Sequence, residues 1–185
     1  MKTAIIIHGF KSKPDTNWKP WLKSELEQHG FTVKVPEMPN TMHPQVAAWV
    51  EKLTDTVNAH RSDEIYLIGH SLGCITILKY LEQQTASNIK VCLFIAGFTQ
   101  PFRGYAGGHD SFFEKKLDWP SIKKHCHHFV ALHSKDDQNV PIEQLTNFKN
   151  DLNAETIVID GFGHFSSENK ITEVPIVREI ILRIE

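Results

Sequence analysis

The stretch "YLIGHSLGCIT", residues 66–76, places a serine between two glycines where an apolar run ends and a helix-forming run begins. Ser71 fits the pattern G-x-S-x-G, which is typical of a nucleophile elbow when a strand precedes it and a helix follows. In such a turn, side chains at Gly69 or Gly73 would strike the neighbouring backbone. The alternative is an ordinary strand-to-helix turn that happens to contain a serine. The strand and helix patterns on either side favour the elbow.

Six short apolar runs recur along the chain, and helical patterns lie between most of them. The runs are rich in β-branched residues and apolar at consecutive positions, as strands buried on both faces must be. They span residues 4–7, 31–35, 65–68, 91–95, 129–132 and 156–159. Helices are predicted around residues 18–29 and 46–57 and in the tail. This alternation predicts an α/β protein, a three-layer α/β/α sandwich around a mostly parallel six-stranded sheet, as one domain over residues 1–185.

Candidate catalytic side chains follow the predicted strands, where parallel sheets place their binding sites. A serine hydroxyl needs a base to become a nucleophile, and the base needs a carboxylate to orient it. His164, in the glycine-flanked loop of "IDGFGHFSSE", is the candidate base, and an aspartate of "LHSKDDQNVP" is the candidate acid. The order serine, acid, histidine is that of the α/β-hydrolases rather than that of the chymotrypsin or subtilisin types.

The chain resembles the α/β-hydrolases, and among them the small, capless serine hydrolases of the retinoblastoma-binding protein 9 type and their bacterial relatives. The resemblance rests on "IIIHGFKSKPDTNWKPWLKSEL", "IGHSLG", "HSKDDQNVP" and "GHF", and it covers essentially the whole chain. It implies a minimal α/β-hydrolase fold without a full cap domain. The family's D-x-x-V-P pattern assigns the acid to Asp137, because Val140 follows three residues later. Asp136 is then a neighbour whose side chain should point elsewhere.

The negatively charged oxygen that forms when Ser71 attacks a carbonyl needs two hydrogen-bond donors. One is expected from the backbone N–H of Leu72 at the start of a helix. The resemblance assigns the other to the N–H of Phe10, with Gly9 allowing close approach, although an ordinary turn at Gly9 is the alternative. The residues expected to line the substrate pocket are His8, His70, Phe98 and Phe165. Segment 97–113 is long and rich in glycine and aromatic residues, and either lines this pocket or forms a surface loop.

Charge and cysteine content argue against several classes of protein. The net charge is -2, from 20 basic and 22 acidic residues without a dense basic run, so neither a nucleic-acid surface nor a membrane patch is expected. The three cysteines lack metal-type spacing and the N-terminal apolar run is too short for a signal peptide, which favours the cytoplasm. In "HCHH", residues 125–128, successive side chains of a strand point to opposite faces, so no metal site is expected.

Together these patterns predict a metal-independent serine hydrolase of the carboxylesterase kind that needs no cofactor. Its partner is expected to be a small-molecule carboxylic ester or similar acyl compound, cleaved through a covalent acyl-enzyme. Ser71 attacks, His164 transfers the proton and Asp137 orients His164. The alternative is a binding protein that keeps the α/β-hydrolase fold with little turnover. The complete set of nucleophile, base and acid favours the enzyme, and no feature of the sequence indicates an oligomeric state.

Overall fold

The computed structural model describes residues 1–61, 63–84, 89–105 and 107–184. At its centre is a six-stranded sheet in the order β2-β1-β3-β4-β5-β6, in which every pair of neighbouring strands is parallel. The strands are β1 (Lys2–Ile7), β2 (Phe31–Lys34), β3 (Glu64–His70), β4 (Ile89–Ile95), β5 (Cys126–Ser134) and β6 (Glu155–Ile159). Each strand coincides with one of the predicted runs, so the predicted parallel sheet is confirmed.

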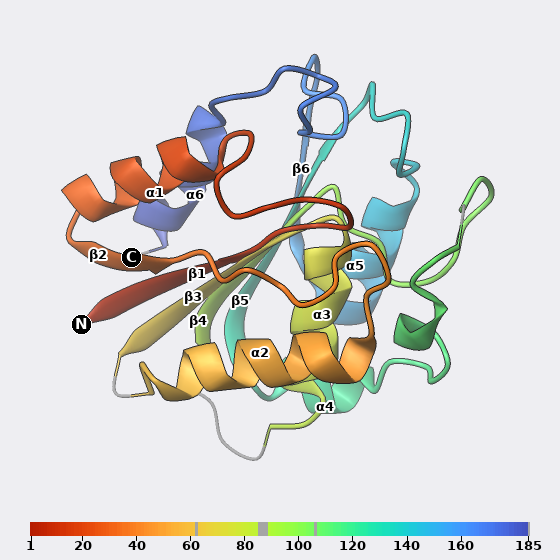
Figure 1. Cartoon of the computed structure of the whole chain (residues 1–185), viewed down its shortest axis with the longest axis horizontal. Coiled ribbons are helices and arrows are strands. Elements are labelled where there is room, and N and C mark those ends of the chain that lie inside the picture. The colour runs from red at the N-terminus through yellow and green to blue at the C-terminus, as the bar shows by residue number, and fades with distance from the viewer. Residues whose placement is uncertain (62, 85–88, 106, 185) are drawn as a thin grey trace.

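Helices cover both faces of this sheet (Figure 1). They are α1 (Lys19–Gln28), α2 (Val46–Asn58), α3 (Leu72–Leu81), α4 (Trp119–Lys123), α5 (Gln144–Leu152) and α6 (Pro175–Arg183), with a short 3-10 helix η1 (Asp110–Phe112). Helices α1 and α6 share one hydrophobic core with the sheet, and α2, α3, α4 and α5 share the other. The predicted three-layer α/β/α sandwich is therefore confirmed.

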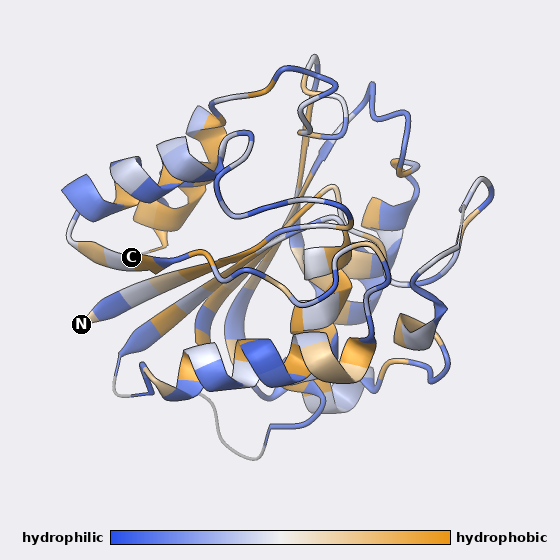
Figure 2. Ribbon diagram, in the orientation of Figure 1, coloured by the Kyte–Doolittle hydropathy of each residue, from blue (hydrophilic) through white to orange (hydrophobic). Residues whose placement is uncertain are grey.

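The two cores follow from the alternation of side chains along each strand. In β1, Ile5 and Ile7 belong to the core under α2 and α3, whereas Ala4 and Ile6 belong to the core under α1 and α6. All four side chains are fully buried. Figure 2 shows the same arrangement as hydrophobic strands in the middle and helices with polar outer surfaces. Burial on both faces explains why the strands are apolar at consecutive positions.

The connection between β4 and β5 determines how open the site is. Its described residues, 96–105 and 107–125, form only η1 and the five-residue α4 as regular structure, so no cap domain is built there. Since all strands run parallel, the loops after β1, β3, β5 and β6 gather at one edge of the sheet. Among the described helices, none has the length and apolar character needed to cross a membrane.

Candidate active site

Ser71 lies in a strained turn between β3 and α3. Its φ and ψ angles are 53° and -117°, a combination that non-glycine residues rarely adopt and that raises the side chain out of the turn. No side chain fits at either of the two flanking glycines. A Cβ at Gly69 would lie 2.8 Å from the backbone nitrogen of Cys74, and a Cβ at Gly73 would overlap the carbonyl oxygen of Ile7. The turn thus has the geometry expected of a nucleophile elbow.

His164 connects Ser71 to Asp137 through both of its ring nitrogens. Its Nε2 lies 3.0 Å from Ser71 Oγ, and its Nδ1 lies 2.9 Å from Asp137 Oδ2. With the proton on Nδ1 donated to the carboxylate, Nε2 is left as an acceptor for the serine hydroxyl. The structure therefore brings together the three residues predicted from the sequence, which come from the loops after β3, β5 and β6.

The carboxylate of Asp137 is fully buried and fixed in orientation. Its Oδ1 accepts hydrogen bonds from the backbone N–H groups of Asn139, at 2.8 Å, and Val140, at 3.0 Å. The buried ring of His133 lies on its other side, with Nε2 3.5 Å from Oδ2 and 2.9 Å from the carbonyl oxygen of Val140. These contacts leave Oδ2 directed at His164, so the acid cannot swing away from the base.

Asp136 points elsewhere, as expected, and holds the loop that carries His164. Its Oδ1 accepts hydrogen bonds from the backbone N–H groups of Gly161 and Gly163, each at 3.1 Å, and from the hydroxyl of Ser134. The hydroxyl of Ser134 is the main cause that lowers the pKa of Asp136, so the carboxylate stays charged. The two adjacent aspartates thus contact different parts of the same loop.

Two side chains from other elements hold the backbone of the histidine loop. His70 Nε2 lies 2.8 Å from the carbonyl oxygen of His164, and the indole of Trp18 donates to the carbonyl oxygen of Phe165 at 3.1 Å. Burial lowers the pKa of His70 well below its usual value, so its ring is neutral and Nε2–H is the donor. The backbone N–H of His164 in turn donates to the side chain of Asn169 at 2.9 Å. The base is therefore fixed through main-chain atoms on both sides.

The two residues expected to supply oxyanion donors both lie beside Ser71. Phe10 and Leu72 line the same cavity as the serine. The turn after β1 is close to the nucleophile, because a Cβ at Gly9 would lie 3.0 Å from Ser71 Cβ. Leu72 is the first residue of α3, where backbone N–H groups lack intrahelical partners and favour negative charge. Both amides are thus candidates to hold an anionic oxygen.

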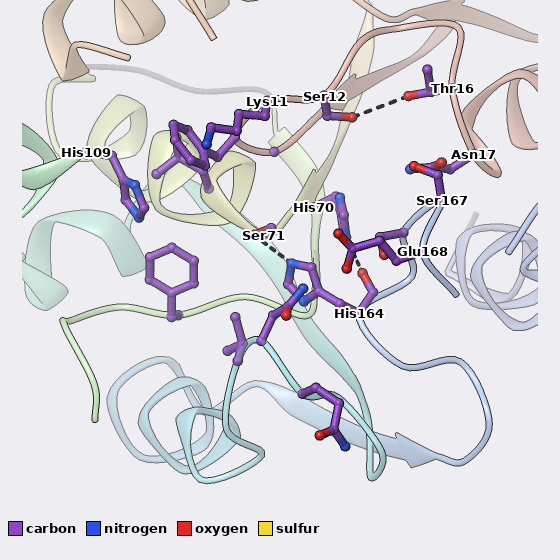
Figure 3. Close-up of a pocket in the computed structure, with 18 of the residues that line it drawn as sticks. Lys11, Ser12, Thr16, Asn17, His70, Ser71, His109, His164, Ser167 and Glu168 are labelled. Carbon is purple, nitrogen blue, oxygen red and sulfur yellow. Dashed lines mark hydrogen bonds between the residues drawn. The ribbon is translucent and has the colours of Figure 1, made fainter. Parts of the chain in front are cut away.

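Ser71 opens onto a cavity of about 680 Å³ with two chemically different ends. The aromatic end is lined by Phe98, Phe102, Tyr105 and His109. The polar end is lined by Ser12, Thr16, Asn17, Ser167 and Glu168. Figure 3 shows the labelled residues of the polar end on one side of Ser71 and His109 on the other. Segment 97–113, for which a surface loop was the alternative, lines the aromatic end.

Two of the four predicted pocket residues do not line the cavity, and the prediction is corrected for them. His8 is fully buried beneath the turn after β1, where its Nε2 accepts a hydrogen bond from the backbone N–H of Met38 at 3.2 Å. Phe165 is fully buried in the core under α1 and α6. Beyond the end of a strand, side chains no longer alternate between faces, so adjacency to a motif does not fix their direction. His70 and Phe98 do line the cavity.

The sequence did not single out the polar end of the cavity. Ser12 and Thr16 lie in the run "KSKPDTN" directly after β1, at the edge of the sheet where binding sites of this fold gather. Their position at this edge of the sheet is the sequence signal that could have identified Ser12 and Thr16 as pocket residues. His109 was also missed; its ring lies 4.7 Å from that of Tyr105, between centroids, in the aromatic end.

The "HCHH" stretch lies at the start of β5, away from Ser71. Cys126 is buried, whereas His127 and His128 are exposed. Over the part of the chain that the structure describes, no three or more His, Cys, Asp or Glu side chains are grouped so that they could hold a metal ion.

Comparison with known proteins places this geometry in a family. The model of the serine hydrolase family matches residues 4–183. YdeN of Bacillus subtilis is 30% identical over 182 residues, which are 97% of this chain and 94% of YdeN. Serine hydrolase RBBP9 of Rattus norvegicus is 22% identical over 181 residues, 96% of this chain and 95% of the rat protein.

Solved structures agree with the sequence comparisons. The crystal structure of the B. subtilis ydeN gene product superposes with a TM-score of 0.90 at 29% identity, covering 100% of this chain and 98% of the other. A hydrolase of the alpha/beta superfamily from Xanthomonas campestris pv. campestris, at 16% identity, shares the fold with a TM-score of 0.68 over 98% of each chain. The family match over nearly the whole chain shows that this protein belongs to the serine hydrolase family within the α/β-hydrolase fold, and is a hydrolase at that level of function.

Proposed function

We propose that the protein hydrolyses carboxylic esters of small molecules, or similar acyl compounds, with Ser71 as the nucleophile. The observation that carries the proposal is the continuous hydrogen-bonded chain from Asp137 through His164 to Ser71, with distances of 2.9 Å and 3.0 Å. A binding protein has no need for a base and an acid aligned on a serine hydroxyl. The strain at Ser71 supports the same conclusion, since strained backbone gathers at catalytic residues.

In the first half of the reaction, Ser71 Oγ forms a bond to the carbonyl carbon while its proton passes to His164 Nε2. The carbonyl oxygen becomes an anion held by the N–H groups of Phe10 and Leu72. When the bond to the leaving alcohol breaks, His164 gives its proton to the leaving oxygen and the acyl-enzyme remains. Water then attacks the acyl-enzyme and loses a proton to His164. His164 gives this proton to Ser71 Oγ as the bond between Oγ and the acyl carbon breaks, which releases the acid and regenerates the serine hydroxyl. Asp137 stays ionised and stabilises the imidazolium in both halves.

The two ends of the cavity suggest how the substrate lies. His164 must protonate the leaving group, and the loop that carries it also supplies Ser167 and Glu168 of the polar end. The leaving group is therefore assigned to the polar end. The acyl group is assigned to the aromatic end, where Phe98 and Phe102 pack with their centroids 5.5 Å apart. This orientation is inferred because His164 protonates the leaving group, and because Ser167 and Glu168 lie on the same loop as His164.

Labelling with a fluorophosphonate tests the proposal, because this probe reacts with activated serines and not with ordinary ones. Labelling of the wild-type protein that is lost in Ser71→Ala, together with turnover of p-nitrophenyl acetate, is expected. Binding of esters without labelling or turnover would instead support the alternative, a binding protein that keeps the α/β-hydrolase fold. The mechanism uses no metal, so the rate should be unchanged by a chelator; activity restored only by added zinc would contradict it.

We also propose that the protein acts in the cytoplasm. The support is that Cys74, Cys92 and Cys126 are free thiols buried in the core, which is the usual state in a reducing compartment. Fractionation of cells that express the protein with a C-terminal tag tests this, and recovery in the secreted fraction would contradict it.

A further inference from the structure

Lys19 is a buried charged side chain that the proposed reaction does not use. It is fully buried, and among the described residues no carboxylate lies within salt-bridge distance of its Nζ. It is also the first residue of α1, where the helix dipole adds further positive potential. Lysines are almost never fully buried unless they are paired with an anion, because burial of an unpaired charge is costly. Lys19 is thus a buried positive charge that no described carboxylate pairs with at salt-bridge distance, and Asp15 acts on it only from farther away.

The partners of Lys19 connect it to the polar end of the cavity. Its Nζ donates to Ser12 Oγ at 3.3 Å and to Thr16 Oγ1 at 3.2 Å, and both hydroxyls line the cavity. Thr16 already donates its own hydrogen to the carbonyl oxygen of Lys13 at 3.0 Å. Ser12 is therefore the donor of the hydrogen bond to Thr16 Oγ1, and because this bond is long, at 3.4 Å, the Ser12 hydroxyl can turn and donate to a ligand in the cavity instead. A hydroxyl that accepts from an ammonium group is a stronger donor toward an anion.

We propose that the polar end of the cavity binds a carboxylate carried by the leaving group of the substrate, with Ser12 as its donor and Lys19 as the charge behind it. A carboxylate fits because one lysine balances one negative charge, whereas a phosphate would bring more charge and needs more donors. The inference rests on the proposed ester hydrolysis, since it specifies the substrate of the same site. Ser12 and Lys19 are specificity-determining residues and take no part in the proton transfers.

Glu168 provides the competing interpretation, because it also lines the polar end and would favour a cationic group. It is exposed at the surface, where water screens its charge, whereas Lys19 lies in a low-dielectric interior. The buried charge should therefore dominate the selectivity. Figure 3 shows Ser12 and Thr16 joined by their hydrogen bond on the loop after β1, and Glu168 on the histidine loop.

A matched pair of esters tests the proposal: para-acetoxybenzoate, whose leaving group carries a carboxylate, and its methyl ester, whose leaving group is neutral. The ratio of kcat/KM for the two esters is measured for each variant, so that differences in intrinsic reactivity cancel. In Lys19→Met the ratio should fall roughly tenfold or more, with the neutral ester changed less than threefold. Ser12→Ala should lower the same ratio by a smaller factor.

Two further variants serve as controls. Lys23→Met makes the same substitution one turn later on α1, where the side chain of Lys23 is partly exposed and pairs with Glu27, and should leave both the ratio and the neutral rate unchanged. Glu168→Gln should raise the ratio slightly, because it removes a negative charge near the bound carboxylate. A ratio that falls in Glu168→Gln, or a wild-type preference for a cationic leaving group, would overturn the proposal.

The pH dependence of the ratio provides an independent measurement if Lys19→Met does not fold. Burial lowers the pKa of Lys19 to about 8, while the nearby carboxylate of Asp15 raises it. Two rings that act on this site, those of His8 and His70, are neutral because burial lowers the pKa of each, whereas the charged side chains of Lys11, Lys13 and Glu168 line the same cavity from exposed positions. Lys19 is charged below about pH 8, so the wild-type preference for the anionic ester should decline as the pH rises through 8. Effects of pH on the catalytic steps that the two esters share cancel in the ratio.

The outcomes separate this inference from the proposed function. Hydrolysis of both esters with a ratio that is the same in the wild type, Lys19→Met and Ser12→Ala, and that does not change with pH, would overturn the carboxylate site and leave the hydrolase intact. Absence of hydrolysis of either ester, together with absence of fluorophosphonate labelling, would overturn the proposed function itself.

Discussion

The nucleophile and the base of this site are positioned by opposite means. The turn at Ser71 is fixed by steric constraints within a few residues, since Gly69 and Gly73 leave no room for a side chain against the adjacent backbone. The loop at His164 contains glycines too, but hydrogen bonds from distant segments hold it, among them those of Asp136 and His70. One element is shaped by local sequence and the other by tertiary contacts.

This difference predicts where mutations will act. A side chain added at Gly69 or Gly73 would deform the packing of α3 on the sheet, because the turn is part of the core, and should lower stability together with activity. A change in the contacts of the histidine loop displaces a surface segment whose residues Ser167 and Glu168 are exposed, and should lower activity with less effect on stability.

Ser71→Ala removes the nucleophile without enlarging the side chain in the turn. The value of kcat/KM for p-nitrophenyl acetate should fall roughly 10⁴- to 10⁶-fold, as for other enzymes that lose a member of such a triad. The thermal midpoint should change little, because the substitution keeps the Cβ and leaves both glycines in place. Equal activity of the variant would show that another residue carries out the reaction.

Asp137→Asn and Asp136→Asn compare the acid with the residue that holds the loop. Asp137→Asn should lower kcat about 10⁴-fold, because the amide favours the wrong tautomer of His164. Asp136→Asn keeps an oxygen that can accept from Gly161 and Gly163, so the loss should be about tenfold or less. Both rates can be measured with the same ester at pH 7. The reverse ranking would show that the acid has been assigned to the wrong aspartate.

Gly73→Ala tests the steric account of the elbow. The added Cβ would overlap the carbonyl oxygen of Ile7, so we expect the free energy of unfolding to fall by about 3 kcal/mol or more. Gly30→Ala is the control, since a Cβ there meets no atom within 4 Å and costs only the strain of its φ of +81°, about 1 to 2 kcal/mol. Urea unfolding followed by tryptophan fluorescence measures both. Equal losses would mean that close packing does not hold the elbow.

The fold and the elbow could be predicted because their signals are local. Consecutive apolar residues indicate strands buried on both faces, and the spacing of Gly69, Ser71 and Gly73 reflects contacts within one turn. The short D-x-x-V-P pattern distinguished Asp137 from Asp136. Its physical basis is that Asp137 Oδ1 accepts hydrogen bonds from the backbone N–H groups of Asn139 and Val140.

The walls of the cavity could not be predicted in the same way. His8 and Phe165 lie next to the motifs, yet their side chains enter the interior because loop direction depends on packing against distant elements such as α2 and α6. Lys19 was not expected in the interior, since lysine is among the residues least often buried. Its environment arises only when the loop after β1 folds over α1 and places Ser12 and Thr16 around the ammonium group.

The smallest expected effect concerns acid stability, and it tests whether hydrogen bonds hold the histidine loop. The hydroxyl of Ser134, with backbone N–H groups of Gly161 and Gly163, lowers the pKa of Asp136 below the ordinary value of 3.8. A carboxyl whose pKa is lowered on folding contributes stability that is complete above its unfolded pKa and is lost as the pH falls through its folded pKa. The urea midpoint of the wild type should therefore decrease more between pH 5 and pH 2 than that of Asp136→Asn.

Asp63→Asn is the matched control for this measurement. The hydroxyl of Thr3 is the main cause that lowers the pKa of Asp63, which immediately precedes β3 and so lies at the opposite edge of the sheet from Ser71. The substitution should flatten the acid profile in the same way, but leave ester hydrolysis at pH 7 unchanged, whereas Asp136→Asn should reduce it. If Asp136→Asn keeps the full acid sensitivity of the wild type, its carboxylate does not stabilise the loop. The position of His164 would then depend on the other contacts of its loop, such as those with His70, Trp18 and Asn169.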